Sequence, residues 1–300
     1  DCLLSRGLGD VYKRQPLYAS IIGNVINFCL NAFFLFVLHK GVAGVATATV
    51  ISRIINLVIV VLLGAVLVKA KQHPERESNR AVMGQIIRIG LPSACETAIY
   101  NVSMTLVIRF LNQMDAQGLN VTARSYTMQI TNFSYCVGAA LAQANAIMTG
   151  WHIGAKEYDA CDRGTKKAAV IGVIVAVILE TVFTLCSGWI MQLFSKDPQM
   201  VSLVGKLLAI DIVLEIGRVT NLVYGQALKT SGDAVFPVVM GACFMILCSV
   251  GGTYLFGIRL GLLAVGAYIG MTGDECVRAV GMYLRWKSGK WKEKGLVKSR

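Results

Sequence analysis

Long apolar runs separated by short polar segments dominate the chain from residue 17 onwards. A helix needs about 20 mainly apolar residues to cross the hydrocarbon core of a bilayer. Eight runs have about this length, at residues 17–38, 42–68, 89–111, 126–148, 168–193, 201–228, 235–256 and 260–284. The pattern therefore predicts an all-α polytopic membrane protein with eight transmembrane helices.

The amino-acid composition favours the same fold class. The chain is 55% hydrophobic and only 15% charged, with a mean hydropathy of +0.60, whereas soluble globular domains have about 25% charged residues. The run over residues 126–148 is the most polar, because it is rich in Gln, Asn, Ser, Thr, Gly and Ala. This composition favours a helix that is buried among other helices and lines a polar cavity.

The net charge of +12 has an uneven distribution along the chain. With the C-terminus in the cytoplasm, the loops expected outside hold only Lys40, Lys196 and Arg259. The loops expected inside hold Lys69, Lys71, Arg76, Arg80, Arg88, Lys156, Arg163, Lys166, Lys167, Lys229 and the basic C-terminal segment. An excess of basic residues on the cytoplasmic side is a topology signal of membrane proteins, so no nucleic-acid partner is expected.

The chain divides into segments of different composition. Residues 1–15 (DCLLSRGLGDVYKRQ) are unlike the rest, look like translated adapter sequence and are excluded from fold reasoning. Residues 69–88 predict a cytoplasmic amphipathic linker between the helices of residues 16–68 and a six-helix bundle over residues 89–285. Residues 286–300 predict a basic cytoplasmic tail, with Trp286 and Trp291 at the inner headgroup surface of the membrane lipid.

The run over residues 201–228 carries ionisable side chains that a bilayer disfavours. Asp211, Glu215 and Arg218 are spaced four and three residues apart, and Asn221 follows one turn later, so all four lie on one helix face. Because a charge at mid-bilayer costs about 2.5–3.5 kcal/mol or more, this face predicts a binding site or a wet cavity. The alternative is structural, with Glu215 and Arg218 paired on their own helix.

Other polar residues of the predicted spans are candidates for the same site. Glu96, Tyr100 and Asn101 follow the Gly90-Leu91-Pro92 sequence, at which one helix is expected to end and the next to begin, and Gln143 and Asn145 lie in the most polar run. Hydrogen bonds between helices use the same residue types, which is the alternative for each of them. Glu180 is a lone acid in an apolar run, expected to be protonated or paired across helices.

Metal and enzyme chemistry have little support in the sequence. The nine cysteines form no CxxC motif and no paired Cys/His spacing, so no metal site and no cofactor are predicted. An intramembrane hydrolase or transferase built on Asp211 and Glu215 would lack a Ser/His or metal constellation. The chain is therefore not expected to be an enzyme.

Several motifs together resemble one transporter family. IGLPSACE after a basic linker, ALAQANAIMTGWHIGAKEYD, EIGRVTNLVYGQALKTSGDAVFP and DECVRAVGMYLRWKSGKW are similar to the bacterial multidrug and toxin extrusion (MATE) transporters. The resemblance implies twelve helices in two six-helix lobes, of which this chain would hold the fifth to the twelfth. It also implies a multi-pass protein of the bacterial cytoplasmic membrane that exports organic small molecules, expected to be cationic, in exchange for Na⁺ or H⁺. A chain without its first four helices is expected to be inactive alone.

The resemblance does not transfer the ion site of the family. Sodium-coupled members carry an acid on the seventh helix near the position of Tyr100, whereas this chain has Glu96 one turn earlier. On the tenth helix the acid is expected near Arg218, and Glu215 again precedes it. A related architecture belongs to flippases of lipid-linked precursors, whose cavity should be richer in basic residues. From the sequence, Arg109 and Arg218 are the residues that would supply that charge.

Overall fold

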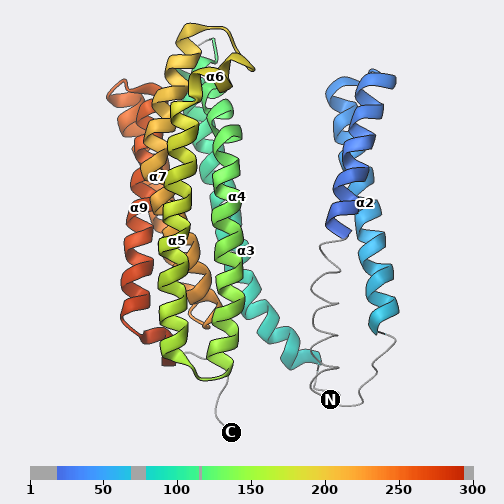
Figure 1. Cartoon of the computed structure of the whole chain (residues 1–300), viewed down its shortest axis with the longest axis vertical. Coiled ribbons are helices and arrows are strands. Elements are labelled where there is room, and N and C mark those ends of the chain that lie inside the picture. Colours follow the sequence, from blue (N-terminus) through green and yellow to red (C-terminus); the bar gives the residue numbers. More distant parts are fainter. Residues whose placement is uncertain (1–18, 69–78, 115–116, 294–300) are drawn as a thin grey trace. The chain divides into compact units, whose positions relative to one another are not determined.

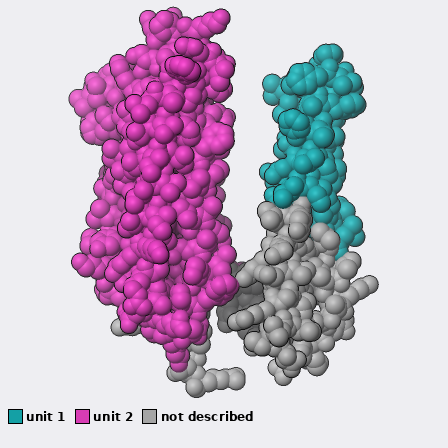
Figure 2. Space-filling view, viewed as in Figure 1, with its two compact units in different colours: residues 1–79 teal, residues 80–300 magenta. Residues whose placement is uncertain are grey.

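The computed structural model describes residues 19–68, 79–114 and 117–293, and within these ranges the chain is helical and contains no strand. Two compact units follow one another along the chain, unit 1 over residues 1–79 and unit 2 over residues 80–300 (Figure 2). The adapter-like residues 1–15, residues 69–78 of the predicted linker and residues 294–300 of the tail lie outside the described residues.

Unit 1 is a helical hairpin. A helix over Ala19–Val37, whose last turn is the π-helix η1 (Phe33–Val37), lies antiparallel beside α2 (Gly41–Val68) (Figure 1). Asn27 donates a hydrogen bond across the hairpin to the Ser52 hydroxyl at 2.9 Å. Most apolar side chains face outward, and Phe28 is 75% exposed. This surface suits helices that contact lipid or further helices.

Unit 2 is a helical bundle organised around α7 (Pro198–Thr230), which packs against α4, α5 and α9 (Figure 1). Its other elements are α3 (Asn79–Met114), α4 (Leu119–Gly154), α5 (Tyr158–Leu185), α6 (Ser187–Gln192), α8 (Val235–Phe244), η2 (Met245–Val250), η3 (Thr253–Arg259), α9 (Leu263–Lys287) and η4 (Lys290–Glu293). The segment from α8 to η3 forms one helical span over Val235–Arg259, with π-helical stretches in it.

Local sequence explains how α7 begins and how closely it packs. Asp197 caps its first turn, because its carboxylate accepts the backbone N–H of Gln199 at 2.9 Å, and Pro198 occupies the first helical position. Further along, Gly217 lets α7 approach the backbone of α9. A Cβ atom at Gly217 would lie 2.9 Å from the backbone nitrogen of Cys276. This close approach places the charged face of α7 against α9.

Each predicted span overlaps a helical segment of the described chain, but two features of the prediction differ in the structure. Helix α3 runs without interruption through Gly90-Leu91-Pro92, where one helix was expected to end and another to begin. The predicted span over residues 168–193 is divided at Cys186 into α5 and α6. Proline lacks the backbone N–H that donates within a helix, but a helix can bend at proline and continue, as α3 does at Pro92.

Four helical segments of the described chain are long and apolar enough to cross a membrane: Ala19–Val37, Gly41–Leu62, Tyr158–Leu185 and Val235–Arg259. Helices α3, α4, α7 and α9 have the length but not this composition. Helices α4, α7 and α9 carry most of the buried polar residues of unit 2, and the apolar helix α5 adds the buried acid Glu180.

The placement of Trp286 and Trp291 at a lipid surface is wrong. Both indoles are buried, stack on one another with ring centroids 4.2 Å apart, and pack in the core of unit 2. The Trp286 indole N–H donates to Asp162 at 2.9 Å, and that of Trp291 donates to the Trp286 carbonyl at 3.0 Å. The hydrogen bond to Asp162 of α5 holds Trp286 inside the protein, and the turn after α9 places Trp291 against it.

Candidate functional site

The charged face of α7 is buried inside unit 2. Asp211 and Glu215 have 2% and 0% of their surface exposed. Glu215 accepts an ion-paired hydrogen bond from Arg218 one turn later. The pairing of Glu215 with Arg218 on one helix, raised above as the structural alternative, is therefore present. Asp211 is not part of that pair.

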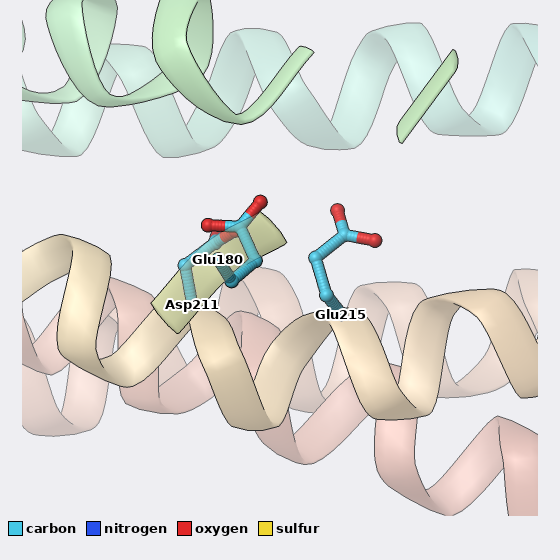
Figure 3. Close-up of side chains that lie close together, drawn as sticks. All are labelled: Glu180, Asp211 and Glu215. Atoms are coloured by element: carbon cyan, nitrogen blue, oxygen red, sulfur yellow. The ribbon is translucent and has the colours of Figure 1, made fainter. Parts of the chain in front are cut away.

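A third carboxylate joins this face from α5. Glu180 is fully buried, and carboxylate oxygens of Glu180, Asp211 and Glu215 lie within 4.8 Å of one another. Figure 3 shows Asp211 and Glu215 projecting from the same side of α7, with Glu180 beside Asp211. We refer to these three residues as the carboxylate cluster.

The cluster has unused hydrogen-bonding capacity. Both carboxylate oxygens of Glu180, together with Oδ2 of Asp211 and Oε2 of Glu215, have no hydrogen-bond partner among the described residues. Ser134 on α4 is a neighbour of Glu180, and its hydroxyl also has no partner in the described part of the chain. Since buried carboxylates are costly unless paired, the cluster is suited to hold a hard cation through oxygen ligands, or protons.

An ion-pair network connects Arg218 to α9. Glu275 lies 3.9 Å from Arg218, forms an ion pair with Arg278 at 2.9 Å and accepts a hydrogen bond from the Asn221 amide at 3.0 Å. Arg278 also donates to Asp274 at 2.9 Å, and Asp274 accepts from the Ser249 hydroxyl at 2.9 Å. Charges from α7 and α9 thus neutralise one another beside the carboxylate cluster.

Two cavities adjoin this network. The first has a volume of about 250 Å³ and is lined by Asp211, Arg218 and Arg124, together with apolar and aromatic side chains. The second has a volume of about 470 Å³ and is lined by Glu96 and Asn221 among others. Both cavities share Tyr100, Tyr135, Arg218, Glu275 and Arg278. Asp211 is the member of the cluster that lines the first cavity.

The second cavity contains an ion pair between α3 and α7. Lys229 donates to the Glu96 carboxylate at 2.6 Å, and both side chains are about one-fifth exposed. Glu96 is therefore neutralised by a partner distant in sequence. Glu96 therefore differs from the acids of the carboxylate cluster, which keep carboxylate oxygens without a partner among the described residues.

The structure brings together six of the predicted site residues and leaves three apart. Glu96, Tyr100, Asp211, Glu215, Arg218 and Asn221 lie at the cavities or at the cluster beside them. Asn101 and Gln143 are exposed, and Asn101 donates to the Thr97 carbonyl of its own helix. Asn145 is buried and donates across to Thr165 of α5 at 3.4 Å, a contact between helices.

Sequence reasoning did not assign Glu180, Arg124, Lys229, Asp274, Glu275 or Arg278 to the site. The acids and the arginine of α9 carried a usable signal, since Arg278 follows Asp274 by four residues and Glu275 by three, spacings at which side chains meet on a helix. For Glu180 the sequence shows only a lone acid within an apolar run. Its contact with Asp211 depends on how α5 crosses α7, which no local pattern encodes.

Comparison with known proteins identifies the family. The profile of the MatE family matches residues 92–255, more than half of the chain. The chain belongs to the MATE family. Members of this family are multi-pass membrane transporters rather than enzymes, so the resemblance predicted from the motifs is confirmed.

Individual relatives agree with this assignment. The chain is 33% identical over 292 residues to the uncharacterized transporter YisQ of Bacillus subtilis, covering 95% of this chain and 64% of YisQ. It is 22% identical to the probable multidrug resistance protein NorM of Thermotoga maritima, covering 97% of this chain and 63% of that protein. The chain thus spans somewhat under two-thirds of the length of these relatives.

A solved structure shows the same fold. The MATE transporter ClbM in complex with Rb⁺ superposes with a TM-score of 0.71 at 18% identity, over 92% of this chain and 62% of that one. At this identity the likeness concerns the fold.

Proposed function

We propose that the protein is a secondary active efflux transporter of the bacterial cytoplasmic membrane, which exchanges Na⁺ or H⁺ for organic small molecules. In this proposal the chain contributes eight transmembrane helices, equivalent to the fifth to twelfth of a two-lobe, twelve-helix transporter, with a cytoplasmic C-terminus. The first four helices of the same protein complete the substrate path, so this chain alone does not transport.

The proposal rests on the position of Asp211, which belongs to two sites at once. Its carboxylate belongs to the carboxylate cluster and also lines the first cavity. A cation or proton held by the cluster neutralises Asp211, and a positively charged group of a substrate in the cavity requires the same carboxylate ionised and free. Because the two ligands compete for one group, binding of either releases the other, which is the requirement for exchange.

The names of related proteins support this reading. NorM of Thermotoga maritima is described as a probable multidrug resistance protein, and ClbM was solved in complex with the monovalent cation Rb⁺. A cluster of carboxylates in the same fold provides the oxygen ligands that alkali cations prefer. Sodium is therefore our first candidate for the coupling ion.

The test uses the natural full-length protein reconstituted in liposomes. Asp211→Asn keeps the shape of the side chain but removes its charge, so we expect loss of organic-cation movement driven by a Na⁺ or H⁺ gradient. The matched control is Asp197→Asn, an exposed acid at the start of α7 whose asparagine still caps the helix. Equal transport by the Asp211→Asn variant and the wild type would overturn the exchange mechanism.

The flippase alternative is less well supported by the charges at the cavities. Arg218, Arg278 and Lys229 do line them, but each is paired with a carboxylate. A cavity that selects a polyanionic headgroup needs several unpaired basic groups. Arg124 also lines the first cavity, but no described carboxylate forms a salt bridge with it.

A further inference from the structure

We propose that Arg124 binds a carboxylate of the transported substrate, so that the substrate is an organic zwitterion rather than a simple cation. The inference rests on the proposed function, since it identifies the ligand of the first cavity. It adds a chemical class that neither the family assignment nor the names of the relatives provide.

Arg124 is a buried cation whose donors are nearly unused. It lies in the second turn of α4 with 6% of its surface exposed and lines the first cavity. Its Nη2 lies 3.6 Å from the Met104 thioether, a weak acceptor, and its Nε has no partner in the described part of the chain. Among the described residues, no carboxylate forms a salt bridge with it.

A guanidinium in this position requires an anionic ligand or water. Removing an ionised side chain from water is unfavourable unless it is paired and hydrogen-bonded. The neighbouring cavity, of about 250 Å³, has room for a ligand at the guanidinium. A planar guanidinium binds a carboxylate through two parallel hydrogen bonds, so a carboxylate is the group that satisfies Arg124 best.

The same cavity offers a site for a positive group. Asp211 lines it with an unpartnered oxygen. The buried Tyr268 lines this cavity together with Asp211 and Arg124, so two opposite charges face the same space. Met104, Met128 and Met271 supply apolar lining for an aromatic or aliphatic scaffold. The arrangement suits a molecule with an amine at one end and a carboxylate at the other.

The experiment measures binding of two matched dyes to the purified full-length protein in detergent. One probe is an aminoxanthene dye with a free carboxylate, and the other is the methyl ester of the same dye. We expect Arg124→Gln to weaken binding of the acid about tenfold or more, because a hydrogen bond to a charged group is lost. Binding of the ester should change by less than about twofold, which also reports that the variant is folded.

Two further variants sharpen the comparison. Arg124→Lys keeps the charge without the planar fork and should give an intermediate loss for the acid. Arg109→Gln removes an exposed arginine of α3 that does not line the cavity, and should leave both affinities unchanged. Equal loss of both dyes in Arg124→Gln, or a wild-type protein that does not prefer the acid to the ester, would overturn the proposal.

A separate readout distinguishes failure of the proposed function. If the wild-type protein prefers the acid and loses this preference in Arg124→Gln, yet moves neither dye under a Na⁺ or H⁺ gradient, the role of Arg124 stands and the exchange mechanism fails. If a gradient drives transport of both dyes but the wild type does not prefer the acid, the exchange mechanism stands and the role of Arg124 fails.

Discussion

Glu180 lies within an apolar helix, fully buried, with both carboxylate oxygens unpartnered among the described residues. It belongs to the carboxylate cluster but does not line either of the two cavities beside it, whereas Asp211 belongs to the cluster and lines the first one. The two residues therefore allow ion binding and substrate binding to be separated by mutation. Substitution of Glu180 should change ion binding and leave substrate binding unchanged.

Glu180→Gln is expected to lower the affinity for Na⁺ by about tenfold or more, because one of the carboxylate ligands becomes a neutral amide. Without a bound cation the variant should be at least as heat-stable as the wild type, since one buried charge has been removed. The measurement is the melting temperature of the full-length protein in choline chloride with increasing NaCl. Glu157→Gln, an exposed acid outside the cluster, is the control.

An unchanged Na⁺-dependent increase of the melting temperature in Glu180→Gln would remove Glu180 from the ion site. Loss of the increase in both Glu180→Gln and Glu157→Gln would show that the loss is not specific to the carboxylate cluster, and would also contradict the assignment of Glu180 to the ion site. Dye binding should stay within about twofold of the wild type in both variants.

At the scale of elements, the contact between α7 and α9 positions most of the charged network. Gly217 lies between Glu215 and Arg218, and a Cβ there would lie 2.9 Å from backbone atoms of Glu275 and Cys276. Backbone cannot move aside as the end of a flexible side chain can. The glycine thus sets the distance at which Glu275 meets Arg218 and Asn221.

Gly217→Ala should destabilise the protein by about 1–3 kcal/mol, because the added methyl group pushes α9 away from α7. Substrate binding should weaken as well, since Glu275 and Arg278 line both cavities. Gly164→Ala is the control, as a Cβ at this exposed position of α5 meets nothing within 4 Å. Alanine there should stabilise the helix by up to about 1 kcal/mol. Similar melting temperatures for the two variants would contradict the role of Gly217.

Local patterns predicted the elements and one face of the site. Apolar run length located the helices, and helical spacing placed Asp211, Glu215 and Arg218 together, because both are properties of a single segment. The helix stop predicted at Pro92 is wrong, since helix α3 continues through this residue. The meeting of Glu180 with Asp211, or of Lys229 with Glu96, depends on helix crossings between distant segments.

At the scale of the whole molecule, the contacts of unit 2 collect its basic loops at one end. Trp286 at the end of α9 donates to Asp162 near the start of α5, and Arg285 donates to Asp233 after α7 at 2.6 Å. The α4–α5 connection, the α7–α8 connection and the C-terminal segment are therefore neighbours. This end carries Lys156 in the α4–α5 connection and, near the adjoining helix ends, Lys166, Lys167, Lys229 and Lys287.

The opposite end of unit 2 is poorer in basic residues. There Asn120, at the start of α4, accepts the backbone N–H of Ala264 at 3.2 Å, and Tyr126 contacts Phe194 with ring centroids 5.4 Å apart. The loop between α6 and α7, which carries Lys196, and the end of η3, which carries Arg259, lie at this end. The difference in charge between the two ends is the basis of a topology prediction.

Reporter fusions to the full-length protein test that prediction in bacterial cells. A green fluorescent protein joined after Lys287 should fluoresce, and alkaline phosphatase at the same position should be inactive, because basic loops stay in the cytoplasm. Alkaline phosphatase joined after Lys196 should instead be active. Activity after Lys287, or inactivity after Lys196, would invert the orientation of unit 2. The first cavity, with Arg124 near the start of α4, would then lie toward the cytoplasmic rather than the outer half of the membrane.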